Sequence, residues 1–442
     1  MQPNTKPARR FRSPVRVVSP PTRYASCTCK GCPVGAPRRA SGDDRRSKPT
    51  SIPWFPTKKP NSAIVIEYAT MAANESPGEA KANHLPSLDG LRGVAALVVV
   101  LTHSLSGVQS GSDLLIALTA SPLIPLINSK IAVQVFFVLS GFVLTGSLLR
   151  NPSLRAVPQF YVRRIFRIHP PYVVALLIAW MVSFQYLPAR NELSNFGDIL
   201  FNVHLPFDEL IGYLTFPSQA ANQLPVGWTL KIEMIFSFLM PVMLWFALRT
   251  HVALLIAVFI IPFFIGPWGH PILKFGLDFS FGIGLFLYGT ACTATFRRIG
   301  NLGTGVWVIA MLVIANLPLY LDWPWLIDGG SRGSIFLQSV GSAGLVAAAA
   351  YAPPISRLVT GRRCVFVGMI SYSIYLLHWP AAVVASRIPW SGSDLWIVPV
   401  MFAITIPVAA LSYYVVERPS IRFGNRVCSR MDRYLTPVGS SR

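Results

Sequence analysis

Charged side chains are scarce in this chain, and acidic ones are the scarcest. Only 13% of the 442 residues are charged, with 18 acidic residues against 39 basic ones, while 52% are hydrophobic. A soluble globular protein carries about a quarter charged residues, so this chain has too little polar surface to cover itself in water. Long apolar runs recur between residues 91 and 416, and several reach the roughly 20 residues that span a bilayer as a helix. These runs show no strand-like alternation, which excludes an outer-membrane barrel. The sequence therefore predicts an all-α, polytopic membrane helix bundle.

The basic surplus, +21 at pH 7, is unevenly distributed. Residues 1–70 hold fourteen Lys and Arg against three acids, and most other basic residues lie in short segments between apolar runs. This distribution is typical of a membrane protein with basic cytoplasmic loops and a basic tail. The tail lacks interleaved aromatics and any nucleic-acid-binding module, so no nucleic-acid partner is expected. The expected partner of the apolar surface is the lipid bilayer.

Cysteine is also rare and predicts neither metal nor disulfide. Cys27, Cys29 and Cys32 form a CxCxxC cluster, but no fourth Cys or His lies near it, and structural zinc takes four ligands. No metal site is therefore expected.

Composition divides the chain into three parts. Residues 1–84 are rich in Pro, Arg, Ser and Gly and are predicted to be a disordered basic tail. The tail is similar to an organelle transit peptide, but translation from Met71 would remove most of it, and both alternatives stay open. Residues 85–423 form the predicted membrane domain, and 424–442 a short basic cytoplasmic tail.

The apolar segments predict about ten membrane spans. They cover residues 91–106, 131–149, 171–188, 230–248, 251–268, 275–295, 303–320, 334–352, 366–386 and 395–416. Arginines follow every even-numbered segment, and the opposite loops contain few basic residues. Because basic loops stay in the cytoplasm, both termini are predicted to be cytoplasmic. The chain is predicted to be a multi-pass membrane protein, of the inner membrane in a bacterium and of an internal or plasma membrane in a eukaryote.

The segment LDGLRGVAALVVVLTH, residues 88–103, carries charge at both ends of an apolar run. Arg92 and His103 are 11 residues apart, so on a helix they share one face, about 16 Å apart along the axis. A charge at bilayer depth normally faces the bundle interior or a wet cavity. This segment therefore predicts one wall of a cavity that crosses much of the membrane. Asp89 either pairs with Arg92 or caps the helix.

Two further motifs carry charge next to apolar spans. In FYVRRIFRIHPPY, residues 160–172, Arg164 and Arg167 are helical neighbours. They either anchor the helix at lipid headgroups or clamp a phosphate, which paired guanidiniums suit. In GWTLKIEMIFSF, residues 227–238, Glu233 lies inside a span and is expected to be paired or to line a cavity.

The fourth polar motif is GMISYSIYLLHWP, residues 368–380. Ser371, Tyr375 and His378 fall on one helical stripe. The stripe either lines a channel or makes interhelical hydrogen bonds, each worth only about 0.6 kcal/mol. For Ser371 the second alternative is the simpler one.

Together these motifs resemble the acyltransferase-3 family of integral membrane acyltransferases. The resemblance rests on the four motifs above together with VFFVLSGFVLTG (135–146) and VVERP (415–419), which occur in the family's order and cover most of residues 85–423. Members of that family move an acyl group, usually acetyl and sometimes succinyl, from acyl-CoA onto hydroxyls of extracytoplasmic glycans or related acceptors.

The resemblance implies a role for each matching residue. Arg92 and His103 match the essential Arg and His of the first span. Arg164 and Arg167, with Arg163 beside them, match the arginines that hold the CoA phosphates. Glu233 matches an acidic motif residue, and Ser371, Tyr375 and His378 match the later-span motif. Lys231 and Ser237 depart from the family pattern, which leaves the exact role of Glu233 open.

The chemistry of the residues themselves points the same way. Acyl transfer from a thioester to an alcohol needs a base, a donor anchor and stabilisation of the oxyanion. His103 is the best base candidate because an imidazole titrates near working pH, and Glu233 is the second catalytic candidate. No permanently bound cofactor is expected; acyl-CoA, foremost acetyl-CoA, is the predicted donor substrate, and the acceptor is a hydroxyl compound, foremost a carbohydrate. Ser140 and Ser371 are candidates for a covalent acyl intermediate, which remains an alternative to direct transfer.

Two other functions compete with acyl transfer. Buried Arg, Glu and His also mark proton-coupled transporters, but no internal repeat and no pair of Gly/Pro-broken spans is visible. An inactive sensor is the other alternative, and the presence of His103, Arg92 and the arginine pair argues against it.

Overall fold

The computed structural model describes the predicted membrane domain and the helix that follows it. The described residues are 85–106, 108, 121, 124–150, 153–154, 156–183, 212–214, 224–266, 271–321, 331–388 and 394–435. All regular structure within them is helical, which confirms the predicted all-α class. The predicted tail, with its CxCxxC cluster and Met71, lies outside the described residues.

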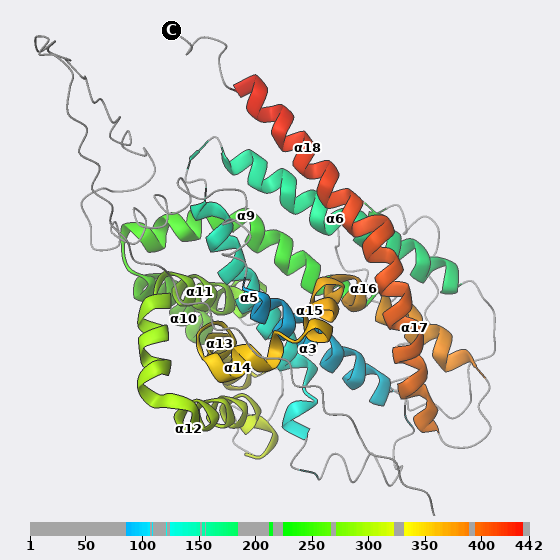
Figure 1. Cartoon of the computed structure of the whole chain (residues 1–442), viewed down its shortest axis with the longest axis horizontal. Helices are drawn as coiled ribbons and strands as arrows, with labels where there is room; N and C mark the ends of the chain where they lie inside the picture. The colour runs from blue at the N-terminus through cyan, green and yellow to red at the C-terminus, as the bar shows by residue number, and fades with distance from the viewer. Residues whose placement is uncertain are drawn as a thin grey trace, which may run out of the picture. The chain divides into compact units, whose positions relative to one another are not determined.

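Figure 1 shows how the helices are arranged. The long helices are α3 (Pro86–Leu105), α5 (Ser129–Leu149), α6 (Ala156–Ser183), α9 (Gly227–Arg249), α10 (Val252–Ile265), α11 (Pro271–Leu287), α12 (Gly289–Asn316), α13 (Arg332–Tyr351), α16 (Ser371–Arg387), α17 (Ile397–Ser412) and α18 (Arg418–Leu435). The short helices are η1 (Ile124–Leu126), η2 (Leu317–Leu319), α14 (Pro353–Val359), α15 (Arg362–Met369), η3 (Asp394–Trp396) and the π-helix η4 (Tyr413–Glu417).

Within the described residues, seven helices are long and apolar enough to cross a membrane. The pair α15–α16 makes an eighth candidate, bent by 68° at Ile370. Helix α10, with 14 residues, and α11, with 17, are shorter. The helices therefore agree with a polytopic bundle.

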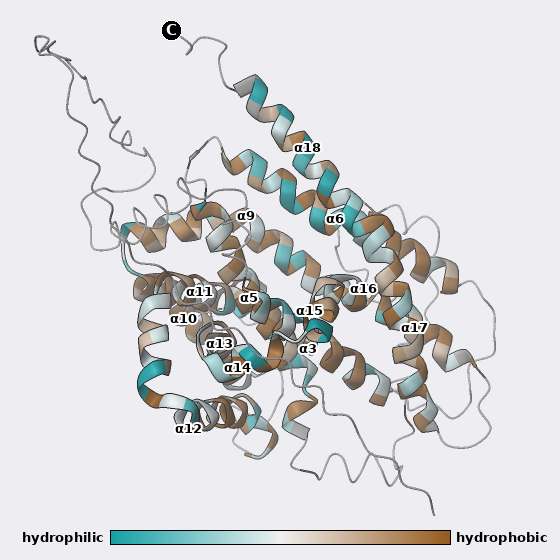
Figure 2. Ribbon diagram, viewed as in Figure 1, coloured by the Kyte–Doolittle hydropathy of each residue, from teal (hydrophilic) through white to brown (hydrophobic). Residues whose placement is uncertain are grey.

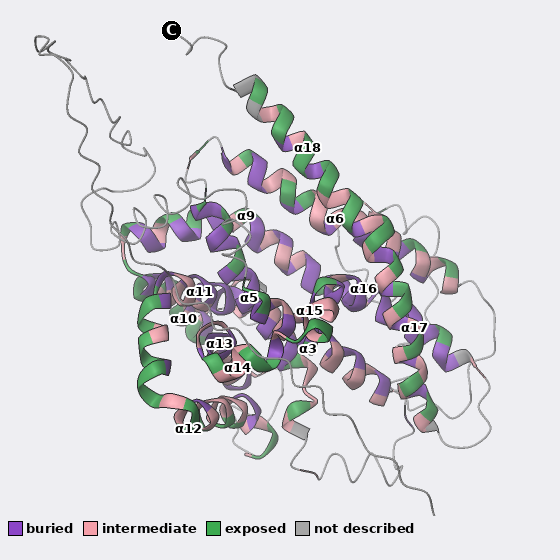
Figure 3. Ribbon diagram, viewed as in Figure 1, coloured by how far each residue is buried: buried purple, intermediate pink, exposed green. Residues whose placement is uncertain are grey.

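Helix α5 lies at the centre of the packing. It contacts α3, α9, α11 and α13, and most of its residues are buried (Figure 3). In contrast, α10, α12 and α17 expose large apolar side chains such as Ile261, Val306 and Leu411, and α17 is mostly brown, the hydrophobic end of the scale, in Figure 2. Exposed apolar faces of this extent are expected where a helix meets lipid.

Three predicted segments differ from the helices in detail. Helix α6 begins at Ala156 rather than at residue 171, so the whole arginine motif is helical and continues through Pro170 and Pro171. The predicted segment 275–295 is divided at Tyr288, which separates α11 from α12. The predicted segment 366–386 contains the bend at Ile370, and the predicted boundary after residue 423 falls inside α18. The hydropathy of a sequence does not predict such breaks, because they change the direction of the backbone without changing how apolar the segment is.

Glycines let the central helices approach each other closely. On α11, a Cβ added to Gly282 would lie 2.6 Å from the backbone nitrogen of Phe142 and 2.8 Å from the Cα of Gly141, both on α5. On α3, a Cβ added to Gly93 would lie 2.7 Å from the backbone nitrogen of Gly368 on α15. Small residues at such crossings are how membrane helices gain packing energy. These two contacts fix α11 and α15 against the helices that carry the polar motifs.

The crossing of α5 and α11 predicts a specific sensitivity to one methyl group. Gly282→Ala is expected to destabilise the protein by about 1–3 kcal/mol, because the methyl group would clash with backbone atoms that cannot rotate away. Gly305→Ala on α12 is the matched control, since a Cβ there meets nothing within 4 Å and Ala favours a helix. Thermal unfolding of the purified variants in detergent measures both changes. Equal unfolding temperatures for the two variants would contradict the proposed backbone contact.

Candidate active site

Polar residues from five helices line one cavity, which we name the arginine cavity. Its volume is about 90 Å³. Its polar lining includes Arg92 from α3, Ser140 from α5, Arg164 and Arg167 from α6, Glu233 from α9, and Ser371 and Tyr375 from α16. Residues far apart in the sequence, from five of the six motifs quoted above, are thus brought together.

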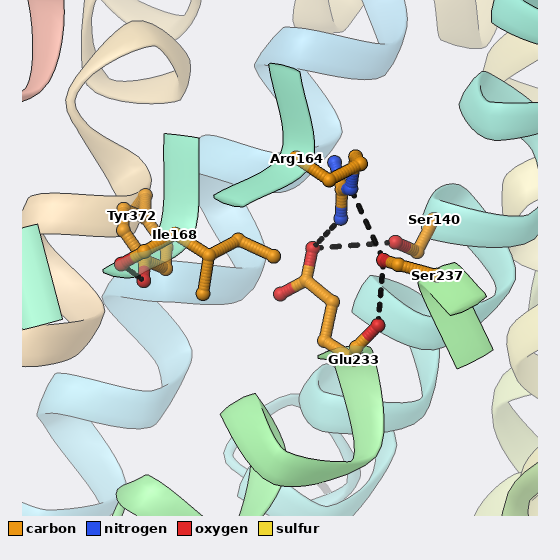
Figure 4. A network of polar contacts seen from close by, with 6 residues as sticks. All are labelled: Ser140, Arg164, Ile168, Glu233, Ser237 and Tyr372. Atoms are coloured by element: carbon orange, nitrogen blue, oxygen red, sulfur yellow. Dashed lines mark hydrogen bonds and ion pairs between the residues drawn. The ribbon is translucent and has the colours of Figure 1, made fainter. Parts of the chain in front are cut away.

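The centre of this cavity is an ion pair between α6 and α9 (Figure 4). The guanidinium of Arg164 donates to Glu233 Oε1 at 2.5 Å and to the Ser237 hydroxyl at 3.1 Å. The Ser140 hydroxyl lies 3.4 Å from the same carboxylate oxygen. The carboxylate is thus held by groups from α5 and α6, and Glu233 is paired and lines a cavity, the two outcomes that a buried carboxylate favours.

The other arginines differ in how they are held. Arg92 pairs with Asp89 at 3.1 Å within α3, so the structure has the ion pair and not the side-chain cap. Arg167 is half-buried at the cavity wall and makes no ion pair with any described residue. Arg163 is exposed, bonds to Gln159 at 3.2 Å, and does not line the cavity. Arg167 is therefore the guanidinium best placed to meet an anion entering the cavity.

His103 lies at a second and larger cavity, which we name the histidine cavity. Its volume is about 350 Å³. Aromatic side chains (Trp228, Phe275, Trp379), amides (Gln134, Gln338) and amines (Lys130, Lys274) share its lining with His103. This size and this mixture of apolar walls with a few polar groups are typical of a small-molecule site.

The two cavities adjoin at Val133 and Tyr375, which line both. The Tyr375 hydroxyl lies 2.9 Å from the hydroxyl of Thr229, which also donates to the Val226 carbonyl at 2.8 Å. Arg92 and His103 thus face two adjoining cavities from one helix, where their spacing predicts one wall of a single cavity. Tyr375 therefore lies between the arginine cavity and the histidine cavity.

His378 occupies a different position from the other residues of its motif. It is fully buried and is not among the residues lining either cavity. Its ring lies behind His103, with His103 Nδ1 and His378 Nε2 2.9 Å apart. Ser371 and Tyr375 of the predicted stripe therefore line the arginine cavity, as does the candidate nucleophile Ser140, whereas His378 contacts the candidate base.

One buried carboxylate near the site was assigned no role from the sequence. Glu417, in the π-helix η4, is 2% exposed and accepts a hydrogen bond of 2.9 Å from Ser373 on α16. An acid inside the short motif VVERP at the end of a span is the sequence signal for it. Glu417 also interacts electrostatically with Arg167, which lines the arginine cavity, so it belongs to the polar interior next to that cavity; short π-helical segments often occur at functional sites.

Comparison with known proteins identifies the family that the chain resembles over most of its length. The acyltransferase-3 family model, described as an acyltransferase domain, matches residues 85–414. Nodulation protein 10 of Rhizobium leguminosarum bv. viciae is 25% identical over 390 residues, which cover 80% of this chain and 97% of that protein. The putative peptidoglycan O-acetyltransferase YrhL of Bacillus subtilis is 25% identical over 78% of this chain and 56% of its own length. The putative membrane-bound transacylase BcsY of Komagataeibacter xylinus is 26% identical over 78% of this chain and 85% of its own length. No solved structure matches the chain.

The ion pair predicts a large effect of losing one partner and a small effect of losing both. Arg164→Met leaves the half-buried Glu233 carboxylate without its ion-pair partner, and Glu233→Met leaves Arg164 without its partner. Each single substitution is expected to cost up to about 3–5 kcal/mol, whereas the double variant Arg164→Met/Glu233→Met is expected to recover most of that loss. Arg163→Met is the matched control, because Arg163 is exposed one residue away. Unfolding temperatures of the two single variants, the double variant and the Arg163→Met control measure the coupling. Additive effects of the two single substitutions would show that the pair contributes nothing.

Proposed function

The chain belongs to the acyltransferase-3 family of multi-pass membrane O-acyltransferases, and from this we propose that it transfers an acyl group, foremost acetyl, from cytoplasmic acyl-CoA to a hydroxyl of a glycan, lipid or related acceptor. The observation that carries the proposal is the pair of adjoining cavities. One holds the three arginines, the other holds His103, and both share Tyr375. This arrangement suits a bisubstrate transfer, in which donor and acceptor enter from opposite sides and meet at the base.

The arginine cavity is the proposed site of the donor. Paired guanidiniums match the geometry of phosphate oxygens, and CoA is an anion rich in phosphate. Arg164 is held by Glu233 and Arg92 by Asp89, which leaves Arg167 as the principal phosphate contact. Glu233 then acts by orienting Arg164. The arm of acyl-CoA that carries the thioester extends through this cavity toward Tyr375.

His103 is the proposed general base. It removes the proton of the acceptor hydroxyl as the oxygen attacks the thioester carbon; the C–S bond then breaks, and the proton passes from His103 to the thiolate of CoA. Ser140 and Ser371 line the arginine cavity and not the histidine cavity. A serine nucleophile needs a base within hydrogen-bond reach. Among the described residues the Ser371 hydroxyl has no hydrogen-bond partner, which weighs against Ser371 as a nucleophile. The Ser140 hydroxyl lies 3.4 Å from Glu233, so a covalent intermediate on Ser140 stays the alternative to direct transfer.

The histidine cavity is the proposed site of the acceptor. Aromatic walls and amide side chains suit a carbohydrate, which presents apolar ring faces and several hydroxyls. The Bacillus subtilis relative is named for peptidoglycan, itself a glycan. These features favour a sugar hydroxyl as the acylated group.

Ten spans with both termini in the cytoplasm form the topological part of the proposal. The seven long helices, the bent pair α15–α16, and the shorter α10 and α11 supply ten apolar segments among the described residues. A fluorescent protein fused to the C-terminus in a bacterial host is expected to fluoresce, and alkaline phosphatase fused there to stay inactive. The opposite pair of results would place the C-terminus outside.

Replacement of His103 tests the proposed function. His103→Ala is expected to lower CoA release from acetyl-CoA plus acceptor by on the order of 10²-fold or more, the usual contribution of a general base. The purified variant should keep the wild-type unfolding temperature within a few degrees. His251→Gln, at the exposed start of α10, serves as the control. Full transfer by His103→Ala would refute the base assignment, and a wild-type protein that transports but releases no CoA would favour the transporter alternative.

Replacement of Arg167 tests the donor site. Arg167→Gln is expected to raise KM for acetyl-CoA roughly tenfold or more, because a charge-assisted hydrogen bond to phosphate is lost. Arg163→Gln, outside the cavity, should raise KM less. An equal rise for both variants would show that the arginines attract the donor only through their overall charge.

A further inference from the structure

The side chains of His103 on α3 and His378 on α16 form a hydrogen-bonded pair of imidazoles. His103 Nδ1 and His378 Nε2 are 2.9 Å apart, and the two ring planes differ by only 2°. The ring centroids are 5.1 Å apart, so the closest approach is between nitrogens and not between ring faces. This is the geometry of an N–H···N hydrogen bond.

A second hydrogen bond decides which nitrogen carries the proton. His378 Nδ1 lies 2.8 Å from the backbone carbonyl of Tyr375. A carbonyl oxygen only accepts, so Nδ1 of His378 must be the donor. Both hydrogen bonds of His378 go to uncharged groups, and an unpaired charge is costly in a fully buried place. The ring is therefore neutral, and its Nε2 carries a lone pair and no proton.

The lone pair on His378 Nε2 in turn fixes the state of His103. It accepts the proton of His103 Nδ1, which leaves the lone pair of His103 on Nε2. His103 lines the histidine cavity, whereas His378 is fully buried behind it. The only base lone pair of the histidine pair thus belongs to the ring that borders the proposed acceptor site.

We propose that His378 is a positioning residue that sets the tautomer of His103 and directs its Nε2 to the acceptor hydroxyl. The proposal rests on the proposed function, in which His103 is the base. When Nε2 takes the hydroxyl proton, His103 becomes an imidazolium, and its Nδ1–H strengthens the bond to His378 Nε2. The proton then leaves from Nε2 to the CoA thiolate, and both rings return to their starting state.

A neutral imidazole suits this position better than a carboxylate would. In serine hydrolases a buried Asp holds the catalytic His in the correct tautomer. An ionised carboxylate at membrane depth is costly unless it is paired. His378 supplies the same lone pair without a permanent charge, and the Tyr375 carbonyl fixes its orientation.

The simplest competing explanation is that the pair only links α3 to α16. Such an interhelical hydrogen bond contributes about 0.6 kcal/mol on average, so it predicts a small loss of stability and no dependence of kcat on the chemistry of the replacement. A role in setting the tautomer predicts that any side chain with a well-placed acceptor restores activity. The two explanations therefore differ in whether a replacement side chain with a hydrogen-bond acceptor restores kcat, and not in the loss of stability that they predict.

The test compares His378→Gln with His378→Leu in the full-length purified protein. Gln presents an acceptor oxygen near the position of Nε2, whereas Leu presents none. We expect kcat of His378→Leu to fall by on the order of 10²-fold or more with KM for acetyl-CoA unchanged, and His378→Gln to keep kcat within about tenfold of wild type. Equal kcat for the two folded variants would overturn the proposal.

Nitrogen NMR of the ¹⁵N-histidine-labelled wild-type protein gives a second measurement that needs no folded His378 variant. The proposal predicts a proton on Nδ1 of His103 and a bare Nε2, with the signal among the seven histidines identified by its loss in His103→Gln and by coupling to His378 across the hydrogen bond. A proton on His103 Nε2 would overturn the proposal.

The same experiments separate this inference from the proposed function. If His103→Gln retains full transfer, His103 is not the base and the proposed function fails in its mechanism. If His103→Gln is inactive while His378→Leu and His378→Gln are equally active, only the inference fails. Tyr375, Lys130 and Lys274 also face the histidine cavity, so the assays are run at one pH to keep their protonation constant.

Discussion

The ion pair between Arg164 and Glu233 is the interaction on which the arrangement of the site depends. A charge inside a bilayer must be paired or face a wet cavity, and this pair does both, at 2.5 Å on the wall of the arginine cavity. It connects α6 to α9, and Ser140 brings α5 to the same carboxylate. Because Glu233 is engaged by Arg164, Arg167 remains available one helical turn away. The pair therefore sets both the packing of three helices and the place where an anion can bind.

The site separates its arginines from its base. The three arginines and Glu233 line one cavity, while the other contains the imidazole, aromatic walls, two amides and two lysines. Helix α3 reaches both, with Arg92 and His103 about 16 Å apart along its axis. This separation lets a phosphate-rich donor be held by arginines in one cavity while its thioester reacts beside the imidazole and the aromatic walls of the other. In such surroundings each hydrogen bond to the reacting atoms is stronger than in water. Tyr375 borders both cavities, so an acyl group that moves from one cavity to the other passes its side chain.

The sequence was enough to predict the helical class, the family and most of the polar residues that line the arginine cavity. Charge inside apolar runs is a strong signal, because lipid makes it costly, and Arg92, Arg164, Glu233 and His103 were all found through it. Helix breaks at Tyr288 and Ile370 were missed, since they depend on tertiary contacts such as that of Gly368 with Asp89. The bond between His103 and His378 could not be predicted either. It joins residues 275 positions apart, and only the folded bundle shows that one ring lines a cavity while the other supports it.

The central claim is that donor and base meet across Tyr375, and a cryo-EM structure with a non-hydrolysable thioether analogue of acetyl-CoA tests it most directly. The account predicts phosphate density beside Arg167 and Arg164 in the arginine cavity. It also predicts that the acetyl carbonyl passes Tyr375 and lies within about 3–3.5 Å of an acceptor hydroxyl held at His103, a near-attack separation. Phosphate density in the histidine cavity, or an acyl group that ends in the arginine cavity away from His103, would contradict it.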